Sequence, residues 1–147
     1  MALIADAGAL FALYDRSEAH HAAVRRAIEQ EAGRVIVPVI ILAELDYLVR
    51  TSLGVAAELD LLEAVVGGAY TLEMPTREDL VRSSELVIQY RDLDIGLADA
   101  SVVATSERLG IERILTVDYR DFRVVRPKSG RPFVLLPADE TPRPRKR

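Results

Sequence analysis

Two acidic residues each follow a short apolar run that has the pattern of a buried strand. Asp6 comes directly after residues 2–5, and Asp118 comes directly after residues 114–117. Ligand sites in open α/β sheets lie just beyond the carboxyl ends of the strands. The two positions therefore predict a site at that edge, although either residue alone could be a turn residue or a helix cap.

Two further acids, Glu44 and Asp99, fall within segments of helical pattern. Residues three and four positions apart share one face of a helix. On that rule the face-mates of both acids are largely apolar: Ile40, Ile41, Tyr47 and Leu48 for Glu44, and Ile95, Gly96, Val102 and Val103 for Asp99. We therefore expect Glu44 on a buried stripe and Asp99 in a similar setting. Taken singly, Glu44 could pair with a buried arginine, and Asp99 could be an ordinary first-turn acid.

Gathering Asp6, Glu44, Asp99 and Asp118 in one place would require a cation, because an unpaired buried carboxylate costs several kcal/mol. The chain has no cysteine and only two histidines, so its oxygen ligands favour Mg²⁺ or Mn²⁺ over zinc. Such ions polarise phosphoryl oxygens and lower the pKa of bound water. The four acids thus predict metal-assisted chemistry on a phosphate group. Without the ion, their mutual repulsion should raise one or more of their pKa values.

The remaining acids are interpreted as surface residues. Asp46 is expected to pair with Arg50, four positions later, on the solvent side of its helix. Asp121 is interpreted as a loop or surface acid beside the last motif. His20 and His21 lie in a stretch of helical, exposed pattern, where a surface role is favoured over general-base chemistry.

The elements that must position these acids alternate along the chain. Strands are predicted at residues 2–5, 35–37, 70–73, 113–117 and, at an edge, 133–136. Helices are predicted at residues 9–14, 17–32, 39–52, 55–66, 76–91 and 97–109, with Ser17 as a helix cap and with Thr76 and Asp79 forming a capping box. This alternation predicts an α/β fold with a mostly parallel central sheet covered on both faces.

The 147 residues are about one domain's worth, which we place at residues 1–137, followed by a basic and flexible tail at 138–147. From Arg126 onward the chain carries +5, and the preceding 125 residues carry −9. An acidic body suits RNA binding poorly unless cations mask some of its acids. No run is long enough to span a membrane and no signal peptide is visible, so a cytoplasmic protein without a membrane partner is expected.

Four segments carry a resemblance to a known family. They are residues 4–8 (IADAG), 37–48 (VPVIILAELDYL), 94–100 (DIGLADA) and 114–122 (ILTVDYRDF), and together they span nearly the whole folded chain. In order and spacing the chain resembles PIN-domain proteins, and specifically VapC toxins of bacterial toxin–antitoxin pairs. Each motif alone is short, and it is the set of four that makes the resemblance specific.

The resemblance implies a three-layer α/β/α PIN fold and a Mg²⁺- or Mn²⁺-dependent endoribonuclease with Asp6, Glu44, Asp99 and Asp118 as metal-binding acids. It also implies a homodimer, a VapB-like antitoxin as partner, and a structured RNA substrate such as tRNA or ribosomal RNA. Thr116 matches a hydroxyl that supports the site in the family. Gly8 departs from the family, which usually has Ser or Thr there, and this puts one contact to the metal shell in doubt.

Two alternatives differ from this interpretation. A phosphate-receiver or phosphatase domain also places Asp at strand ends, but it would need a lysine near the site or an Asp-x-Asp motif, and neither follows the first strand. The second alternative is a non-catalytic PIN-like module that binds RNA or protein. Cleavage of RNA in the presence of metal separates this module from a nuclease.

Overall fold

The central element is a five-stranded sheet in which every neighbouring pair is parallel. The computed structural model describes residues 2–31 and 33–140. The strands, in the spatial order β3-β2-β1-β4-β5, are β3 (Thr71–Glu73), β2 (Val35–Pro38), β1 (Leu3–Ala5), β4 (Arg113–Leu115) and β5 (Val134–Leu136). β1 lies in the middle and all three of its residues are fully buried. A strand covered on both faces must be apolar throughout, which is why residues 3–5 show no alternation.

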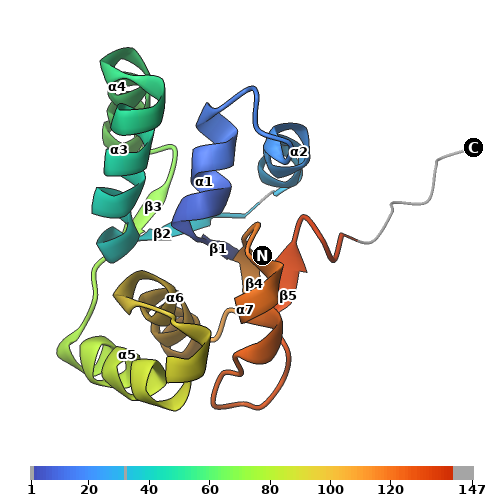
Figure 1. Cartoon of the computed structure of the whole chain (residues 1–147). Coiled ribbons are helices and arrows are strands. Elements are labelled where there is room, and N and C mark those ends of the chain that lie inside the picture. Colours follow the sequence, from blue (N-terminus) through green and yellow to red (C-terminus); the bar gives the residue numbers. More distant parts are fainter. Residues whose placement is uncertain (1, 32, 141–147) are drawn as a thin grey trace, which may run out of the picture.

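Helices cover both faces of this sheet. In chain order they are α1 (Ala7–Tyr14), α2 (His21–Gln30), α3 (Val39–Leu53), α4 (Val55–Val66), α5 (Arg77–Gln89), the short 3-10 helix η1 (Arg91–Leu93), α6 (Leu97–Leu109) and α7 (Tyr119–Val124). Figure 1 shows α1 to α4 on one side of the sheet and the packed pair α5 and α6 on the other. The expected three-layer α/β/α architecture is confirmed.

Local sequence signals account for the ends of several helices. Gly54 and Gly110 adopt positive φ at the ends of α3 and α6, a conformation that glycine accepts without strain. At the start of α5 the predicted capping box is present: the Thr76 hydroxyl accepts the Asp79 N–H, and the Asp79 carboxylate accepts the Thr76 N–H, both at 3.0 Å. α5 therefore begins where the sequence predicts.

Three local predictions are wrong. Ser17 does not cap α2, which begins four residues later, because the Ser17 hydroxyl and N–H both bond to the Asp15 carboxylate in a turn. Residues 119–124 form a helix where none was predicted. Arg50 does not pair with Asp46 but with Glu58 of α4 at 3.7 Å, and Asp46 is half-buried with one carboxylate oxygen that has no hydrogen-bond partner.

The end of the described chain packs against α7. The Asp139 carboxylate forms an ion pair with Arg123 and accepts the Leu135 N–H at 2.8 Å. Most of the expected basic tail, residues 141–147, lies outside the described residues. Among the helices of the described ranges, none combines the length and apolarity needed to cross a bilayer.

Candidate functional site

The first two predicted acids emerge side by side because their strands are neighbours. β1 and β4 pair with Ile4 opposite Ile114 and Ala5 opposite Leu115, and the Asp6 N–H donates to the Leu115 carbonyl at 3.0 Å. Both strands therefore end at the same edge of the sheet. Asp6 and Asp118, far apart in the sequence, are placed together at the edge where ligands bind in α/β folds.

Asp6 is a buried acid with two hydrogen bonds. One carboxylate oxygen accepts the Ala9 N–H at 3.0 Å and so caps α1, while the other accepts the Thr116 hydroxyl. Its side chain is only 5% exposed, and burial raises the pKa of Asp6 to about 7, against the lowering effect of those two hydrogen bonds. Asp6 thus caps α1 and also lines the cavity at the sheet edge, so its interpretation as a helix cap does not exclude its interpretation as a site residue.

Thr116 connects the two strand ends. Its side chain is fully buried, its hydroxyl donates to Asp6, and the same oxygen accepts the Asp118 N–H at 2.9 Å. The Asp118 carboxylate in turn accepts the Asp121 N–H at 3.3 Å, which begins α7. One hydroxyl therefore fixes the orientation of Asp6 and the backbone at Asp118 together.

Asp99 and Glu44 approach from two helices. Asp99 is in the first turn of α6, as predicted, and burial together with the charges of Asp118, Glu44 and Asp121 raises its pKa to about 6. Glu44 is exposed, contrary to the expected buried stripe. The buried stripe of α3 runs through Ile41, Leu45 and Val49, and Glu44 lies at its margin.

All four predicted acids line one cavity of about 240 Å³ at this edge of the sheet. Its walls are Asp6, Ala7, Gly8, Ile41, Glu44, Leu48, Ala98, Asp99, Val117 and Asp118. At Gly8 a side chain would fit, because an added Cβ would lie 3.6 Å from Val117 Cγ2 and 3.8 Å from the Asp6 carboxylate. Gly8 therefore lacks the hydroxyl that the family usually has at this position, and no neighbouring side chain occupies the place of the missing Cβ.

Asp121 belongs to the same cluster, and its interpretation as a loop or surface acid is wrong. It is half-buried in the first turn of α7, and one carboxylate oxygen from each of Asp99, Asp118 and Asp121 lies within 4.8 Å of the others. The sequence signal for this residue is its position three residues after Asp118. That spacing places Asp121 near Asp118 only if residues 119–124 are helical, and the sequence did not predict that helix. We refer to Asp6, Glu44, Asp99, Asp118 and Asp121 as the acidic cluster.

The acidic cluster has no basic partner in the part of the chain that is described. Every ion pair within residues 2–31 and 33–140 involves other acids. Five carboxylates, without Cys or His among them, form the donor set that a hard divalent cation prefers. The residues present therefore fit Mg²⁺ or Mn²⁺.

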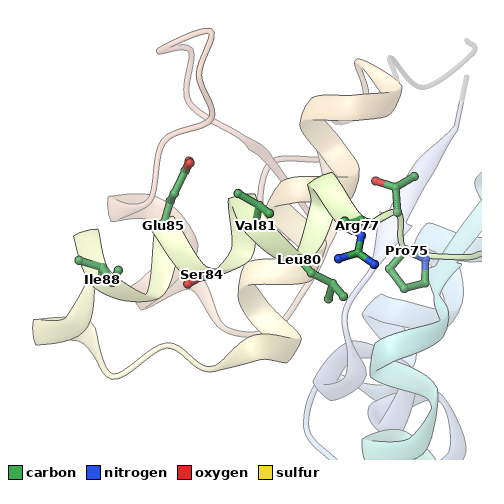
Figure 2. Close-up of a pocket in the computed structure, with 8 residues that line it drawn as sticks. Pro75, Arg77, Leu80, Val81, Ser84, Glu85 and Ile88 are labelled. Carbon is green, nitrogen blue, oxygen red and sulfur yellow. The ribbon is translucent and has the colours of Figure 1, made fainter.

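A larger hollow, of about 730 Å³, lies elsewhere on the described surface. Figure 2 shows it along the outer face of α5, where Leu80, Val81 and Ile88 are exposed beside Pro75 and Arg77. It holds one acid, Glu85, which pairs with Arg82. Its size and apolar lining suit contact with another molecule, and it has no arrangement of groups for chemistry.

The histidines take no part in the acidic cluster. His20 bonds to Glu18 at 3.1 Å, and its ring meets that of Tyr119 edge to face at 6.2 Å. His21 Nδ1 bonds to the Ala12 carbonyl at 2.8 Å. Both histidines thus stabilise the connection between α1 and α2, whereas the sequence predicted only a surface role for them.

Comparison with known proteins agrees with the fold. A model of the PIN domain family matches residues 3–127. A protein named Ribonuclease VapC26, from Mycobacterium tuberculosis (strain ATCC 25618 / H37Rv), is 39% identical over 135 residues, which are 92% of this chain and 100% of that relative.

Among solved structures, that of VapC20 of Mycobacterium tuberculosis, described as a Sarcin-Ricin loop cleaving toxin, superposes with a TM-score of 0.71. The match covers 76% of this chain and 86% of that one at 18% identity, and so it concerns the fold. The family match and the 39% identical relative decide the family: this chain belongs to the PIN domain family and is of the VapC type.

Proposed function

We propose that this chain is a metal-dependent endoribonuclease and the toxin component of a type II toxin–antitoxin pair, acting on structured RNA in the cytoplasm. The observation that carries the proposal is the acidic cluster, in which three acids, Asp6, Asp99 and Asp121, have raised pKa values and none forms an ion pair with a basic side chain among the described residues. Family membership and the similarity to a protein named as a ribonuclease support the reaction class. We assign this activity to residues 1–137.

The proposed cofactor is Mg²⁺ or Mn²⁺, held by Asp6, Glu44, Asp99 and Asp118. When bound, such a cation supplies positive charge to the phosphate under attack and makes water a better nucleophile. A pKa of about 7 leaves a proton on much of Asp6 at neutral pH in the metal-free protein. Binding of a cation therefore releases that proton, and metal affinity should rise with pH.

The chain itself supplies the geometry. The Thr116 hydroxyl holds the Asp6 carboxylate in one orientation, and its acceptance of the Asp118 N–H sets the second strand-end acid relative to the first. Ile41 and Leu48 line the same cavity and reduce its contact with water. Thr116 is thus a positioning residue, since it acts through Asp6 and Asp118.

Two protein partners are part of the proposal, a VapB-like antitoxin and a second copy of this chain. Exposed apolar side chains on α4 and α5 offer surfaces for these contacts: Val55, Leu59, Leu62 and Val66 on α4, and Leu80, Val81 and Ile88 on α5. Sedimentation of the chain alone, and after co-expression with its candidate antitoxin, measures both. A monomer at micromolar concentration would remove the homodimer from the proposal.

The direct test is incubation of the purified chain with tRNA and with ribosomal RNA fragments in Mn²⁺, with and without EDTA. We expect cleavage that EDTA abolishes and that Asp99→Asn reduces at least about 100-fold, because Asp99 contributes charge at the reacting phosphate. Asp60→Asn, at an exposed acid of α4, is the matched control and should cleave normally. Cleavage that persists in EDTA, or in Asp99→Asn, contradicts the proposal.

One outcome would favour the alternative function. If the protein binds Mn²⁺ and RNA but cuts neither RNA class, the non-catalytic PIN-like binding module becomes the better description. Mapping the 5′ ends of cellular RNA after brief induction then decides whether an untested RNA is the substrate. New ends that appear with the wild type and not with Asp99→Asn would restore the nuclease.

A further inference from the structure

We propose that Tyr47 of α3 contacts the RNA substrate, and that its ring stacks on an unpaired base next to the phosphate that is cut. The inference rests on the proposed ribonuclease function and names a residue that binds the substrate outside the acidic cluster. The contact requires an aromatic ring at this position and does not depend on the tyrosine hydroxyl.

The first support is the exposure of Tyr47. It is 67% exposed, and in the described part of the chain it is the one aromatic residue whose side chain is largely open to solvent. The sequence pattern predicts it on a buried stripe, but the buried residues of α3 are Ile41, Leu45 and Val49. An exposed helix position is stabilised better by alanine, glutamate or lysine than by tyrosine. The stability of α3 therefore does not explain the ring.

The second support is that the fold uses the other four tyrosines of the chain. The hydroxyls of Tyr14 and Tyr70 bond to each other at 2.8 Å. The Tyr90 hydroxyl accepts a backbone N–H at 3.1 Å, and the ring of Tyr119 packs edge to face against a histidine. The side chain of Tyr47 has no hydrogen bond, ring pair or core contact of this kind within residues 2–31 and 33–140. It is therefore available for contact with another molecule.

The third support is the place of Tyr47 beside the cavity. Glu44 and Leu48 of α3 both line the cavity, and Tyr47 lies between them in the sequence. With about 3.6 residues per turn, Tyr47 is about 60° round the helix from Glu44, on the side away from the buried stripe. Side chains three positions apart on a helix have Cβ atoms about 5–6 Å apart. Tyr47 thus lies at the rim of the cavity, within reach of a nucleotide whose phosphate is at the acidic cluster.

The charge of the protein indicates which part of the RNA the ring meets. Residues 1–125 carry −9, so attraction to phosphate contributes less to binding than it does in a basic protein. Stacking of a base on an aromatic ring needs no positive charge and accepts any base. Bases are open to such stacking in loops and single strands, whereas a duplex keeps them paired. Tyr47 therefore favours RNA whose bases are unpaired at the cut site.

Tryptophan fluorescence tests the contact directly. The chain contains no tryptophan, so Tyr47→Trp introduces a single fluorophore at the proposed contact. The probe is single-stranded oligoadenylate RNA, and every protein also carries Asp99→Asn so that the RNA stays intact. We expect the RNA to quench the fluorescence and to shield the tryptophan from acrylamide, because a stacked base covers the ring.

The matched control is Val66→Trp. Val66 is 88% exposed at the end of α4 that leads into β3, away from the carboxyl edge of the sheet. Its fluorescence should not change when the RNA is added. Absence of quenching in Tyr47→Trp, or equal quenching in the two variants, overturns the inference.

The affinity for RNA shows whether the aromatic ring itself matters. In fluorescence anisotropy with labelled oligoadenylate, we expect Tyr47→Phe to bind within about two-fold of the parent and Tyr47→Leu about 10-fold more weakly, because leucine is apolar but offers no ring for stacking. A duplex of oligoadenylate with oligouridylate should bind equally to all three proteins. Their melting temperatures should agree, since the change is on the surface. Parental affinity of Tyr47→Leu for the single strand contradicts the proposal.

Failure of this inference is distinguishable from failure of the proposed function. With Asp99 restored, cleavage by Tyr47→Leu at an unchanged KM removes Tyr47 from substrate binding and leaves the nuclease in place. Absence of both RNA binding and cleavage in the wild type removes both. If Tyr47→Leu changes the sedimentation of the chain while its RNA affinity stays at the parental value, Tyr47 belongs to a contact between proteins, and the inference is overturned.

Discussion

Two regions of this molecule gather half-buried acids, and they neutralise them in different ways. Between α5 and α6, Asp79 bonds to Arg108 and Glu107 bonds to Arg82, and Glu73 at the end of β3 also bonds to Arg108, at 2.8–3.0 Å. At the carboxyl edge of the sheet, the acidic cluster has no such partner in the described residues, and Asp6 and Asp99 have raised pKa values instead. Carboxylates that have arginine partners thus stabilise the fold, whereas those of the acidic cluster remain uncompensated among the described residues.

The largest effect is expected when the acidic cluster is given a basic partner of its own, by placing an amine inside it. Leu48 lines the cavity one turn after Glu44, so Leu48→Lys brings an ammonium among the carboxylates. We expect RNA cleavage to fall at least about 100-fold and Mn²⁺ binding to weaken, because the ammonium competes for the same charges. Gel assays of cleavage and Mn²⁺ titration measure the two effects, and Leu48→Met controls for the change in shape. Normal cleavage by Leu48→Lys would show that the cavity does not hold the essential cation.

The stability of the metal-free protein should fall as pH rises from about 4 to 7. The folded-state pKa values of Asp6, about 7, and Asp99, about 6, lie above the 3.8 of an unperturbed Asp, so the unfolded chain loses these protons first. A tenfold difference between the acid dissociation constants of the folded and unfolded chain corresponds to about 1.4 kcal/mol. By this conversion Asp6 alone contributes at most about 4 kcal/mol, and solvent screening reduces the smaller contribution of the half-buried Asp99. We therefore expect a net loss on the order of 2–4 kcal/mol, most of it from the more deeply buried Asp6.

Thermal melts in EDTA at pH 5 and pH 7.5 measure this loss of stability. Asp6→Asn, which cannot ionise, should flatten the dependence on pH. At pH 7.5, Mn²⁺ should raise the melting temperature of the wild type by mass action. A melting temperature that responds neither to pH nor to Mn²⁺ would argue against an uncompensated cluster.

Removing an arginine from the other region should cost stability without touching the chemistry. Arg108→Met leaves the buried Asp79 without its partner and also removes the bond to Glu73, so we expect a loss of about 2–3 kcal/mol of unfolding free energy. Cleavage per folded molecule should be unchanged. Arg25→Met breaks an exposed pair with Glu29 and should cost less than about 1 kcal/mol. Urea unfolding curves compare the two variants.

The smallest expected effect is at Gly8. Gly8→Ser places a hydroxyl near the Asp6 carboxylate at ordinary contact distance, within the first turn of α1. We expect about 0.5 kcal/mol of added stability from the loss of glycine and a two- to three-fold gain in Mn²⁺ affinity from the hydroxyl. Gly8→Ala should reproduce the stability without the affinity. Equal affinities in the two variants would mean that the hydroxyl contributes nothing to the site.

The sequence predicted well those features that depend on neighbouring residues. The bounds of α4 and α6 are as predicted because glycines mark their ends, and the capping box of α5 is present because its three-residue spacing is sufficient to form it. The strand-end positions of Asp6 and Asp118 were readable because a buried strand forces a continuous apolar run. These are local rules, and each acts over a few residues.

Features that depend on tertiary packing could not be predicted from the sequence. The spacing rule gave the face-mates of Glu44 but not which face of α3 packs against the core, and so its exposure was missed. The six residues of α7 are too few to show helical periodicity, and Asp121 was misjudged with them. The sequence predicted an ion pair between Asp46 and Arg50 from their spacing of four. Arg50 pairs instead with Glu58 of α4, and helical spacing cannot predict a partner on another helix.

The order of the strands in the sheet also determines when the site can form during synthesis. The hydroxyl bond that orients Asp6 comes from a residue 110 positions later, and β4 is itself bordered by β5 near the end of the described chain. The chain must therefore emerge from the ribosome as far as Thr116, and for the complete sheet as far as β5, before the carboxylates of Asp6 and Asp118 can be held together. A nascent chain that ends before Asp118 contains Asp6, Glu44 and Asp99 but cannot complete the acidic cluster while it is still beside the ribosomal RNA.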